Sequence, residues 1–408
     1  MTELSTQALA GVKVLDLSRI LAGPSATQLL GDLGADVVKV EKPGEGDDTR
    51  RWGPPFVRGK DGRPTSESAY YLCANRNKRS IAIDLASTAG RELVIELVAQ
   101  ADVLVENYKA GDLARYGLAY EQLRVRFPRL IYCSITGFGQ TGPYAGRPGY
   151  DFLIQGIGGI MSLTGEPDGE PMKTGVGIAD VMTGMYAAVG ILAALQHRHA
   201  TGEGQHIDIS LLDTQIAWLV NAGTNYLLSR ELPERLGNGH PNIVPYQVFP
   251  TQDAPMILAV GNDTQFARLC TVAGLDALPN DSRYATNPQR LAHREELCAL
   301  IASALRVRRR AHWLEALESA GVPCGPVNDL TEVFTDPHVI VRGAELRMPC
   351  YWAADEEIPL LANPLRMSAT PPSYRRVPPR LNEHREDVLR DWLRNGPLTR
   401  DGDKPCTT

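Results

Sequence analysis

Short apolar runs alternate with longer amphipathic stretches over the first 135 residues. The apolar runs have the length of strands and occupy residues 12–17, 36–41, 80–85, 102–106 and 130–134. One helical pattern begins at Gly23-Pro24, where a proline in the first turn loses no hydrogen bond, and a terminating glycine follows at Gly34. Two more helices are expected over residues 88–100 and 120–126. Strands that alternate with helices predict a mostly parallel, doubly wound α/β sheet.

The pattern changes after residue 135 and indicates a second domain. Residues 135–179 are rich in glycine, and loops of this length in a compact chain usually carry function. A long apolar helix is expected over 180–199, then an apolar run at 207–212 and helix up to 228. Residues 255–325 repeat the strand and helix pattern, which predicts a smaller α/β domain. We expect a large Rossmann-like domain over 1–225, the small domain with its linkers over 226–329, a return to the large domain over 330–395, and a disordered tail over 396–408.

Composition and charge exclude several classes of protein. The 408 residues carry 42 basic and 48 acidic side chains, and this net charge of −6 argues against a general nucleic-acid-binding surface. The seven cysteines are scattered and show neither a disulfide framework nor the spacing of metal ligands. The longest strongly apolar stretch, 181–196, is shorter than the ~20 residues that span a bilayer, and the N-terminus lacks the pattern of a secretion signal. We therefore expect a cytoplasmic protein with neither nucleic acid nor membrane as a partner.

Basic residues lie at the ends of several predicted strands. Lys42 follows one strand, the segment 75–79 precedes another, and Lys109 and Arg115 follow a third. These positions bind ligands in an open α/β sheet, and several cations suit a multiply phosphorylated ligand. Ordinary solvated loop charge is the other interpretation, which spacing leaves open. A nicotinamide nucleotide is disfavoured because no G-x-G-x-x-G sequence is present and Pro24 stands where the backbone must approach a pyrophosphate.

Asp180 is the candidate nucleophile. It stands at the start of a long apolar helix, where an aspartate accepts hydrogen bonds from backbone N–H groups and stabilises the helix by ~1 kcal/mol. It also follows a glycine-rich loop, 175–179, whose N–H groups are candidates for oxyanion donors. The two roles are compatible, because a helix N-terminus keeps a carboxylate ionised and therefore nucleophilic. The pattern alone leaves both open.

Several motifs together resemble the class III CoA-transferase family, which includes the α-methylacyl-CoA racemases. They extend from about residue 10 to 390 and read VLDLSRILAGPSATQLLGDLGADVVKVEKPGEGDDTR, NRNKRSIAIDL, ADVLVENYKAGDLARYGL, SITGFGQTGPYAGRPGYD, GIADVMTGMYA, GNGHPNIVPY and GVPCGPVND. The resemblance implies an interlocked homodimer of ring-like subunits. It implies acyl-CoA and a small carboxylic acid as substrates, with coenzyme A entering as a thioester and no tightly bound cofactor or metal.

The site residues are carried over from this family position by position. Asp180 matches the aspartate that forms a covalent intermediate. The positions expected to contact CoA are Ile20, Leu21, Ala22, Lys42, Asn75, Lys78, Asn107, Tyr108, Lys109, Arg115, Thr136 and Phe138. The positions expected to contact the acid substrate are Arg147, Tyr150, Lys173 and His240. Among these, Arg147 and Lys173 are candidates for the cation that pairs with the remote carboxylate of a dicarboxylate, with loop bracing as the other interpretation.

The family resemblance allows more than one reaction. In the transferases of the family, the aspartate first bonds the acyl group as a mixed anhydride and then bonds CoA as an aspartyl-CoA thioester. Racemases use a histidine in a Gly-His-Asp element, where this chain has Gly149-Tyr150-Asp151, and a tyrosine with its usual pKa near ~10 is a poor base at neutral pH. The motifs most resemble the branch that moves CoA from succinyl-CoA to glutarate or an itaconate-like dicarboxylate. The alternatives are a 2-methylacyl-CoA racemase or epimerase, a formyl-CoA:oxalate-type transferase, and a non-catalytic acyl-CoA-binding protein.

Overall fold

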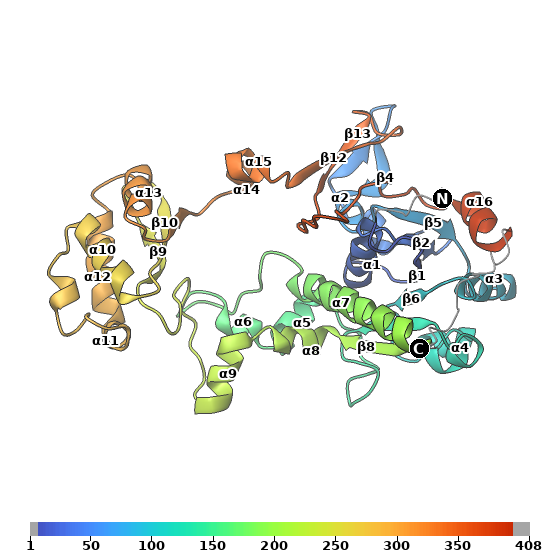
Figure 1. Cartoon of the computed structure of the whole chain (residues 1–408), viewed down its shortest axis with the longest axis horizontal. Helices are drawn as coiled ribbons and strands as arrows, with labels where there is room; N and C mark the ends of the chain where they lie inside the picture. The colour runs from blue at the N-terminus through green and yellow to red at the C-terminus, as the bar shows by residue number, and fades with distance from the viewer. Residues whose placement is uncertain (1–6, 395–408) are drawn as a thin grey trace, which may run out of the picture. The chain divides into compact units, whose positions relative to one another are not determined.

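The computed structural model describes residues 7–394, which form two compact units (Figure 1). The large unit comprises residues 7–160, 173–229 and 342–394, and the small unit comprises Met161–Met172 and Arg230–Val341. The boundaries expected at 225 and 329 therefore fall at 229 and 341, and a piece of the glycine-rich region joins the small unit. The tail expected over 396–408 lies outside the described residues.

A six-stranded parallel sheet forms the centre of the large unit, as the alternating pattern predicts. Its strand order is β5-β2-β1-β6-β7-β8. The strands are β1 (Lys13–Asp16), β2 (Asp36–Glu41), β5 (Lys78–Ala82), β6 (Val103–Glu106), β7 (Ile131–Thr136) and β8 (His206–Ser210). This is the order of doubly wound nucleotide-binding sheets, in which the direction of winding reverses between β1 and β6. The loops that leave these two strands diverge, and ligands bind in the crevice between such loops.

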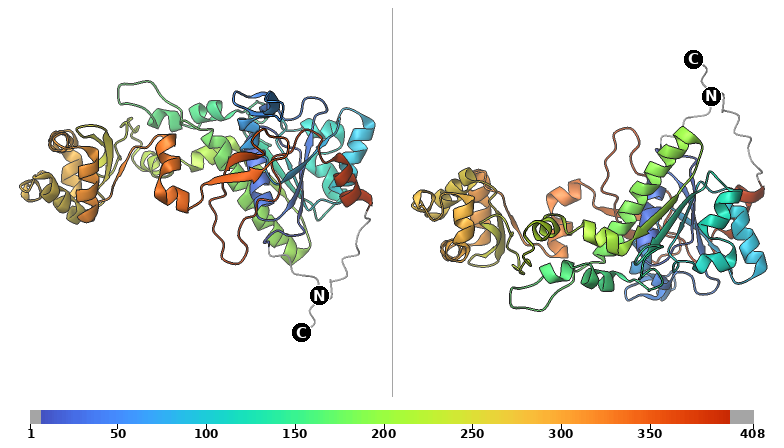
Figure 2. Two further views of the ribbon diagram at one scale, coloured as in Figure 1. Left: turned by 90° about the horizontal axis from the view of Figure 1, so that it is seen from above. Right: turned by 90° about the horizontal axis from the view of Figure 1, so that it is seen from below.

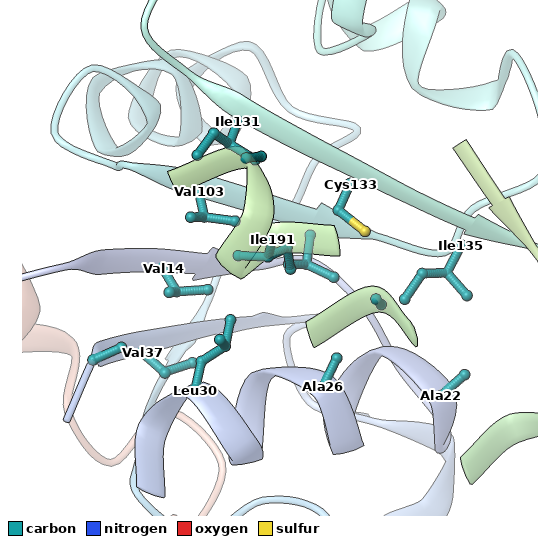
Figure 3. Packing of buried hydrophobic residues seen from close by; sticks show 14 of the residues in the cluster. Val14, Ala22, Ala26, Leu30, Val37, Val103, Ile131, Cys133, Ile135 and Ile191 are labelled. Atoms are coloured by element: carbon teal, nitrogen blue, oxygen red, sulfur yellow. The ribbon is translucent and has the colours of Figure 1, made fainter. Parts of the chain in front are cut away.

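Helices cover both faces of the sheet because successive strand residues point to opposite sides. Val14 packs beneath α1 (Ala22–Asp32) and α7 (Ile178–Thr201), whereas its neighbour Leu15 belongs to the cluster on the other face (Figure 3). That second face is covered by α3 (Thr88–Val98), α4 (Tyr120–Arg126), α16 (Arg385–Val388) and the following π-helix η4 (Leu389–Arg394), as Figure 2 shows. The C-terminal segment thus returns to the large unit, as expected.

Helix α7 makes an unusually close contact with α1. A Cβ atom on Gly184 would lie 2.6 Å from the Ala22 carbonyl oxygen and 3.1 Å from Ser25 Cβ, so only glycine fits there. The inward face of α7 is built of Ala187, Ile191 and other small or branched residues in the same core. Within the described residues, α7 is the one helix long and apolar enough to cross a membrane by length and composition, a property that it shares with the core helices of soluble proteins.

The small unit has an antiparallel sheet, which corrects the expected strand and helix repeat. Strands β9 (Tyr246–Pro250), β10 (Pro255–Ala259) and β11 (Cys324–Pro326) pair in the order β11-β10-β9. The turn between β9 and β10 is short, and the Thr251 hydroxyl bonds Asp253 and the Ala254 carbonyl within it, so the chain reverses immediately. The helices are α10 (Asp263–Ala273), η3 (Leu278–Asn280), α11 (Asn287–Ala292), α12 (Arg294–Leu305), α13 (Arg310–Ser319), α14 (Leu330–Thr335) and α15 (Pro337–Val341).

The remaining elements are short and, apart from α6, belong to the large unit. Two antiparallel hairpins pair β3 (Phe56–Arg58) with β4 (Pro64–Ser68), and β12 (Glu345–Pro349) with β13 (Glu357–Leu361). The short helices are η1 (Asp48–Arg51), α2 (Ala69–Leu72), η2 (Asp112–Tyr116), α5 (Asp151–Ile157), α8 (Leu211–Ala217) and α9 (Val220–Ser229). Helix α6 (Ile160–Leu163) begins at the boundary of the two units.

The contact at Gly184 yields a stability prediction. Gly184→Ala drives a methyl group into the α1 backbone and should lower the free energy of unfolding by about 1–3 kcal/mol. Gly190→Ala is the matched control on the same helix, because its Cβ would meet only Ile207 at 3.4 Å, and it should be neutral or stabilising by up to ~1 kcal/mol. Urea denaturation of the two variants measures both values. Equal effects would show that the two helices are not in tight contact.

Candidate active site

A cavity opens at the point where the winding of the sheet reverses. It is lined by the segments that follow β1 (Arg19–Ala22) and β6 (Asn107–Ala110), by Thr136 at the end of β7 and the adjoining Gly137, by Arg147–Tyr150 of the glycine-rich loop, and by Asp180. We call it the Asp180 cavity. It brings together nine further residues predicted from the sequence, namely Ile20, Leu21, Ala22, Asn107, Tyr108, Lys109, Thr136, Arg147 and Tyr150.

The turn after β1 is held in a strained conformation. Ile20 has a φ of +73°, which is in the left-handed region that a β-branched residue rarely adopts. Its N–H donates to the Asp47 carboxylate oxygens at 3.2 and 3.3 Å, and Asp47 forms a buried ion pair with Lys39 at 2.8 Å. The Asn107 side chain binds both the N–H and the carbonyl of Arg19, at 2.9 and 2.7 Å. Asn107 thus shapes the cavity by bracing its wall.

Asp180 does not cap its helix, which corrects the capping interpretation. Helix α7 begins at Ile178, with Gly177 at the capping position, so Asp180 is the third helical residue. The cap comes from Asp151 of α5, whose Oδ1 accepts the N–H groups of Ala179 at 2.8 Å and Asp180 at 3.3 Å. The Ile178 N–H bonds the Val176 carbonyl. The N–H groups of Ile178 and Ala179, two of the loop groups expected to stabilise an oxyanion, therefore already donate hydrogen bonds within the protein.

The Asp180 carboxyl is buried and close to a second acid. Only 9% of Asp180 is exposed, and burial, together with the charge of Asp151, raises its pKa to about 7. The helix N-terminus therefore does not keep this group ionised at low pH, contrary to the expectation from sequence, because desolvation outweighs it. Tyr70 is coupled to the same group: burial and then the Asp180 charge raise its pKa to about 12. At neutral pH a large share of Asp180 is ionised and its carboxylate is basic for an aspartate.

A second cavity adjoins the first. It is lined by residues at the ends of β1, β2 and β6 and shares Arg19 and Tyr108 with the Asp180 cavity. We call it the Lys42 cavity, since Lys42 and Arg115, two further predicted CoA contacts, line it and are exposed. Lys42 pairs with Glu45 at 2.5 Å and Arg19 with Asp48 at 2.8 Å. Exposed pairs contribute ~0–1 kcal/mol, so breaking either of these two pairs costs little free energy.

Lys78 and Asn75 do not line either cavity, so the structure gives no support to their predicted contact with CoA. Lys78 Nζ is fully buried and donates to Asp16 at 3.1 Å, the Pro24 carbonyl at 2.9 Å and Asn75 Oδ1 at 3.0 Å. Burial would raise the pKa of Asp16, but Lys78 and Lys39 lower it to about 2. The ammonium group is needed inside the protein to neutralise Asp16, and it supports the β1 turn from beneath.

Two other predicted residues, Phe138 and Lys173, do not line the Asp180 cavity, and a third, His240, belongs to the other unit. Phe138 packs on the core and against the Tyr144 ring, 5.6 Å between centroids. Lys173 is exposed, and its ammonium donates to the Thr174 carbonyl at 3.1 Å. His240 belongs to the small unit, where its Nδ1 accepts the Asn242 N–H at 3.1 Å. Arg147 is therefore the better candidate of the two cations proposed for a remote carboxylate.

Sequence reasoning missed Arg19, Tyr70 and the role of Asp151. Arg19 directly precedes the predicted contact residues Ile20, Leu21 and Ala22, and this position could have predicted that it lines the cavity. Tyr70 lies on a four-residue helix, α2, and nothing in the local pattern points to Asp180. Within residues 7–394, no group of three or more His, Cys, Asp or Glu side chains is placed to hold a metal ion.

Comparison with known proteins agrees with this geometry. The fold and the cavity define an α/β protein with a buried carboxylate at the switch point of its sheet, the place where open α/β sheets bind ligands. Residues 9–385 match the model of CoA-transferase family III, and the chain belongs to this family.

Similar proteins cover almost the whole chain. A succinate–glutarate CoA-transferase of Agrobacterium fabrum is 53% identical over 381 residues, 93% of this chain and 94% of the relative. The human succinyl-CoA:glutarate CoA-transferase is 43% identical over 386 residues, 95% and 86% of the two chains. The crystal structure of a CAIB/BAIF family protein from Brucella suis superposes with a TM-score of 0.83 at 49% identity and covers 95% and 99%.

The raised pKa of Asp180 predicts how its replacement affects stability. A carboxyl whose folded pKa lies above the unfolded value of about 4 favours folding at low pH, and that contribution is lost as the pH rises toward 7. Asp180→Asn does not titrate. It should match the wild type in stability near pH 4 and exceed it by on the order of 1–3 kcal/mol above pH 7. Urea denaturation at several pH values checks this, and a stability difference that is the same at every pH would contradict it.

Proposed function

We propose that the protein moves coenzyme A from succinyl-CoA to glutarate or a related small dicarboxylic acid, with Asp180 as the covalent nucleophile. The observation that carries the proposal is the buried, basic carboxylate of Asp180 on the wall of one cavity, which adjoins a second cavity lined by Lys42 and Arg115. The names of the bacterial and human relatives support the choice of donor and acceptor.

The first half of the reaction transfers the succinyl group and then CoA to Asp180. The ionised carboxylate attacks the thioester carbonyl of succinyl-CoA, the C–S bond breaks, and a mixed anhydride and CoA thiolate result. The thiolate then attacks the aspartyl carbonyl of the anhydride, which forms an aspartyl-CoA thioester and releases succinate. Nucleophilic catalysis of this kind divides one difficult exchange into easier steps.

The second half repeats these steps in reverse with the acceptor. The acceptor carboxylate attacks the aspartyl thioester, which forms a new mixed anhydride and frees the thiolate. The thiolate attacks the acceptor acyl carbon, and the products are the new acyl-CoA and the free Asp180 carboxylate. One thioester replaces another, so the sequence balances without a further reactant.

Arg147 is the residue we propose to bind the remote carboxylate of the dicarboxylic acid. It lines the Asp180 cavity, and its guanidinium group lies 4.4 Å from the centre of the Tyr144 ring, which orients the side chain. An arginine binds a carboxylate through two parallel charge-assisted hydrogen bonds. Both succinyl-CoA and glutarate carry such a carboxylate, so one guanidinium group serves donor and acceptor in turn.

Replacing Arg147 should change acceptor choice. In a mixture of glutarate and pentanoate, Arg147→Met should lower the preference for glutarate by roughly 10- to 100-fold, because a charged hydrogen-bond partner is lost. Lys173→Met is the matched control, since Lys173 does not line the cavity. The ratio of the two acyl-CoA products, measured by chromatography, gives the result. An unchanged ratio in Arg147→Met would exclude this role for Arg147.

The activity itself is tested with succinyl-CoA and a panel of acceptor acids. We expect glutaryl-CoA and succinate in equal amounts from the wild type, and no product from Asp180→Asn, which should still bind CoA. Incubation of a 2-methylacyl-CoA in deuterated water without acceptor tests the racemase alternative. Exchange of the α-hydrogen there, or CoA binding without any turnover over the whole panel, would overturn the transferase proposal.

We further propose that two copies of the chain form a homodimer, interlocked as the family resemblance implies. Helix α7 is apolar all round: Met185, Val189 and Leu192 on its outer face are 48%, 63% and 37% exposed. A helix of this kind is normally covered on every side, and the outer face needs a partner. Sedimentation should give twice the chain mass of 44.5 kDa. Val189→Asp should lower the dimer fraction, whereas Val125→Asp on α4 should not, and a single-chain mass for the wild type would refute the dimer.

A further inference from the structure

Helix α5 holds both ends of the glycine-rich loop that leads to Asp180. Gln155 is fully buried, and its Oε1 accepts the Thr174 N–H at 2.9 Å, where the loop begins. Its Nε2 donates to Asp151 Oδ2 at 2.6 Å. The other oxygen of Asp151 accepts the N–H groups of Ala179 and Asp180, where the loop ends and α7 begins. One chain of hydrogen bonds therefore spans residues 174–180.

The loop between these two ends has little rigidity of its own. Gly175 and Gly177 are free of side chains, and glycine loses more conformational freedom on ordering than any other residue. At Gly177 a Cβ atom would lie 3.3 Å from Leu21 Cδ2 and 3.6 Å from Asp151 Cγ, so the loop passes close to both the β1 turn and α5. The direction of the Asp180 side chain depends on this anchoring.

We propose that Asp151 is a positioning residue for the nucleophile, acting together with Gln155. Its carboxylate fixes the first turn of α7, engages the N–H groups of Ala179 and Asp180, and places a negative charge beside the Asp180 carboxyl. Asp151 is not among the residues that line the Asp180 cavity, so it acts through Asp180 and not by touching substrate. The proposal rests on the proposed function, in which Asp180 is the attacking group.

The charge of Asp151 has a chemical consequence. Burial first, and Asp151 second, raise the pKa of Asp180 to about 7, and a more basic carboxylate is a better nucleophile once ionised. When Asp180 is acylated its charge disappears, and the repulsion from Asp151 is relieved. The other ionisable groups around Asp180 are Arg19, Lys109 and Arg147 on the cavity wall, together with the hydroxyl groups of Tyr70, Tyr108 and Tyr150. None of these is on α7, where Asp180 is the acid of the first turn.

The electrostatic part is tested without turnover. A carbodiimide reacts with protonated carboxyl groups, so the pH midpoint of Asp180 labelling, read by peptide mass spectrometry, reports its ionisation. In Asp151→Asn this midpoint should fall by about one pH unit, because a like charge is removed. Asp213→Asn is the matched control: Asp213 is exposed and lies in the first turn of α8 in the same unit. If the Asp151→Asn midpoint equals that of the wild type, the inference is wrong.

The positioning part is tested at pH 9, where Asp180 is ionised in every variant. Asp151→Asn and Gln155→Ala should each lower kcat about 10- to 100-fold, with KM for succinyl-CoA nearly unchanged. Gln155→Ala keeps the charge of Asp151 and should leave the labelling midpoint in place. A wild-type kcat in both variants would overturn the positioning role.

Failure of the proposed function gives a different pattern. If the wild type transfers no CoA, the proposed function is refuted. The labelling midpoint still shows whether Asp151 raises the pKa of Asp180. Circular dichroism and the melting temperature show which variants are folded. If Asp151→Asn does not fold, the labelling experiment uses Asp151→Ser, whose hydroxyl still accepts hydrogen bonds from the helix N–H groups. The pH midpoint of Asp180 labelling should fall by the same amount in that variant.

Discussion

The close contact between α1 and α7 is the constraint on which the rest of the large unit depends. Gly184 lets α7 approach the α1 backbone, and one turn earlier on the same helix stands Asp180. The N-terminus of α1 is also the end of the β1 turn, so this single contact brings the carboxylate to the switch point of the sheet. A larger residue at position 184 would move Asp180 away from the β1 turn that forms the cavity wall.

The site is built from groups that are costly to hold in place. Ile20 is strained, Asp180 is a desolvated acid beside Asp151, and both need support from elsewhere in the protein. Asp151 anchors the segment of Asp180, and two buried ion pairs beneath the β1 turn, Lys39 with Asp47 and Lys78 with Asp16, support the segment of Ile20. Breaking a buried pair by removing one partner costs about 3–5 kcal/mol, so these lysines are structural necessities. The strained and desolvated groups of the site lower the stability of the fold, and the buried ion pairs beneath the β1 turn offset part of that loss.

Sequence reasoning predicted the large sheet well and the small unit poorly, for identifiable reasons. Strands such as β6 are buried on both faces and show consecutive apolar residues, Val103 to Val105, whereas β9 lies in an aromatic, proline-containing segment that shows no such run. For the site, the family resemblance located Asp180 and its cavity but could not show that Lys78 points inward to Asp16. The pKa of Asp180 depends on Asp151, 29 residues away in sequence, and only folding brings the two together.

The central claim is that Asp180 becomes covalently modified during the reaction. The most direct measurement is to mix the protein with succinyl-CoA, quench it rapidly with hydroxylamine, and analyse the peptide that contains Asp180 by mass spectrometry. Our account predicts a hydroxamate on Asp180 that needs succinyl-CoA and is absent from the Asp180→Asn variant. Full transferase turnover with an unmodified Asp180 peptide, or with the hydroxamate on another residue, would contradict it.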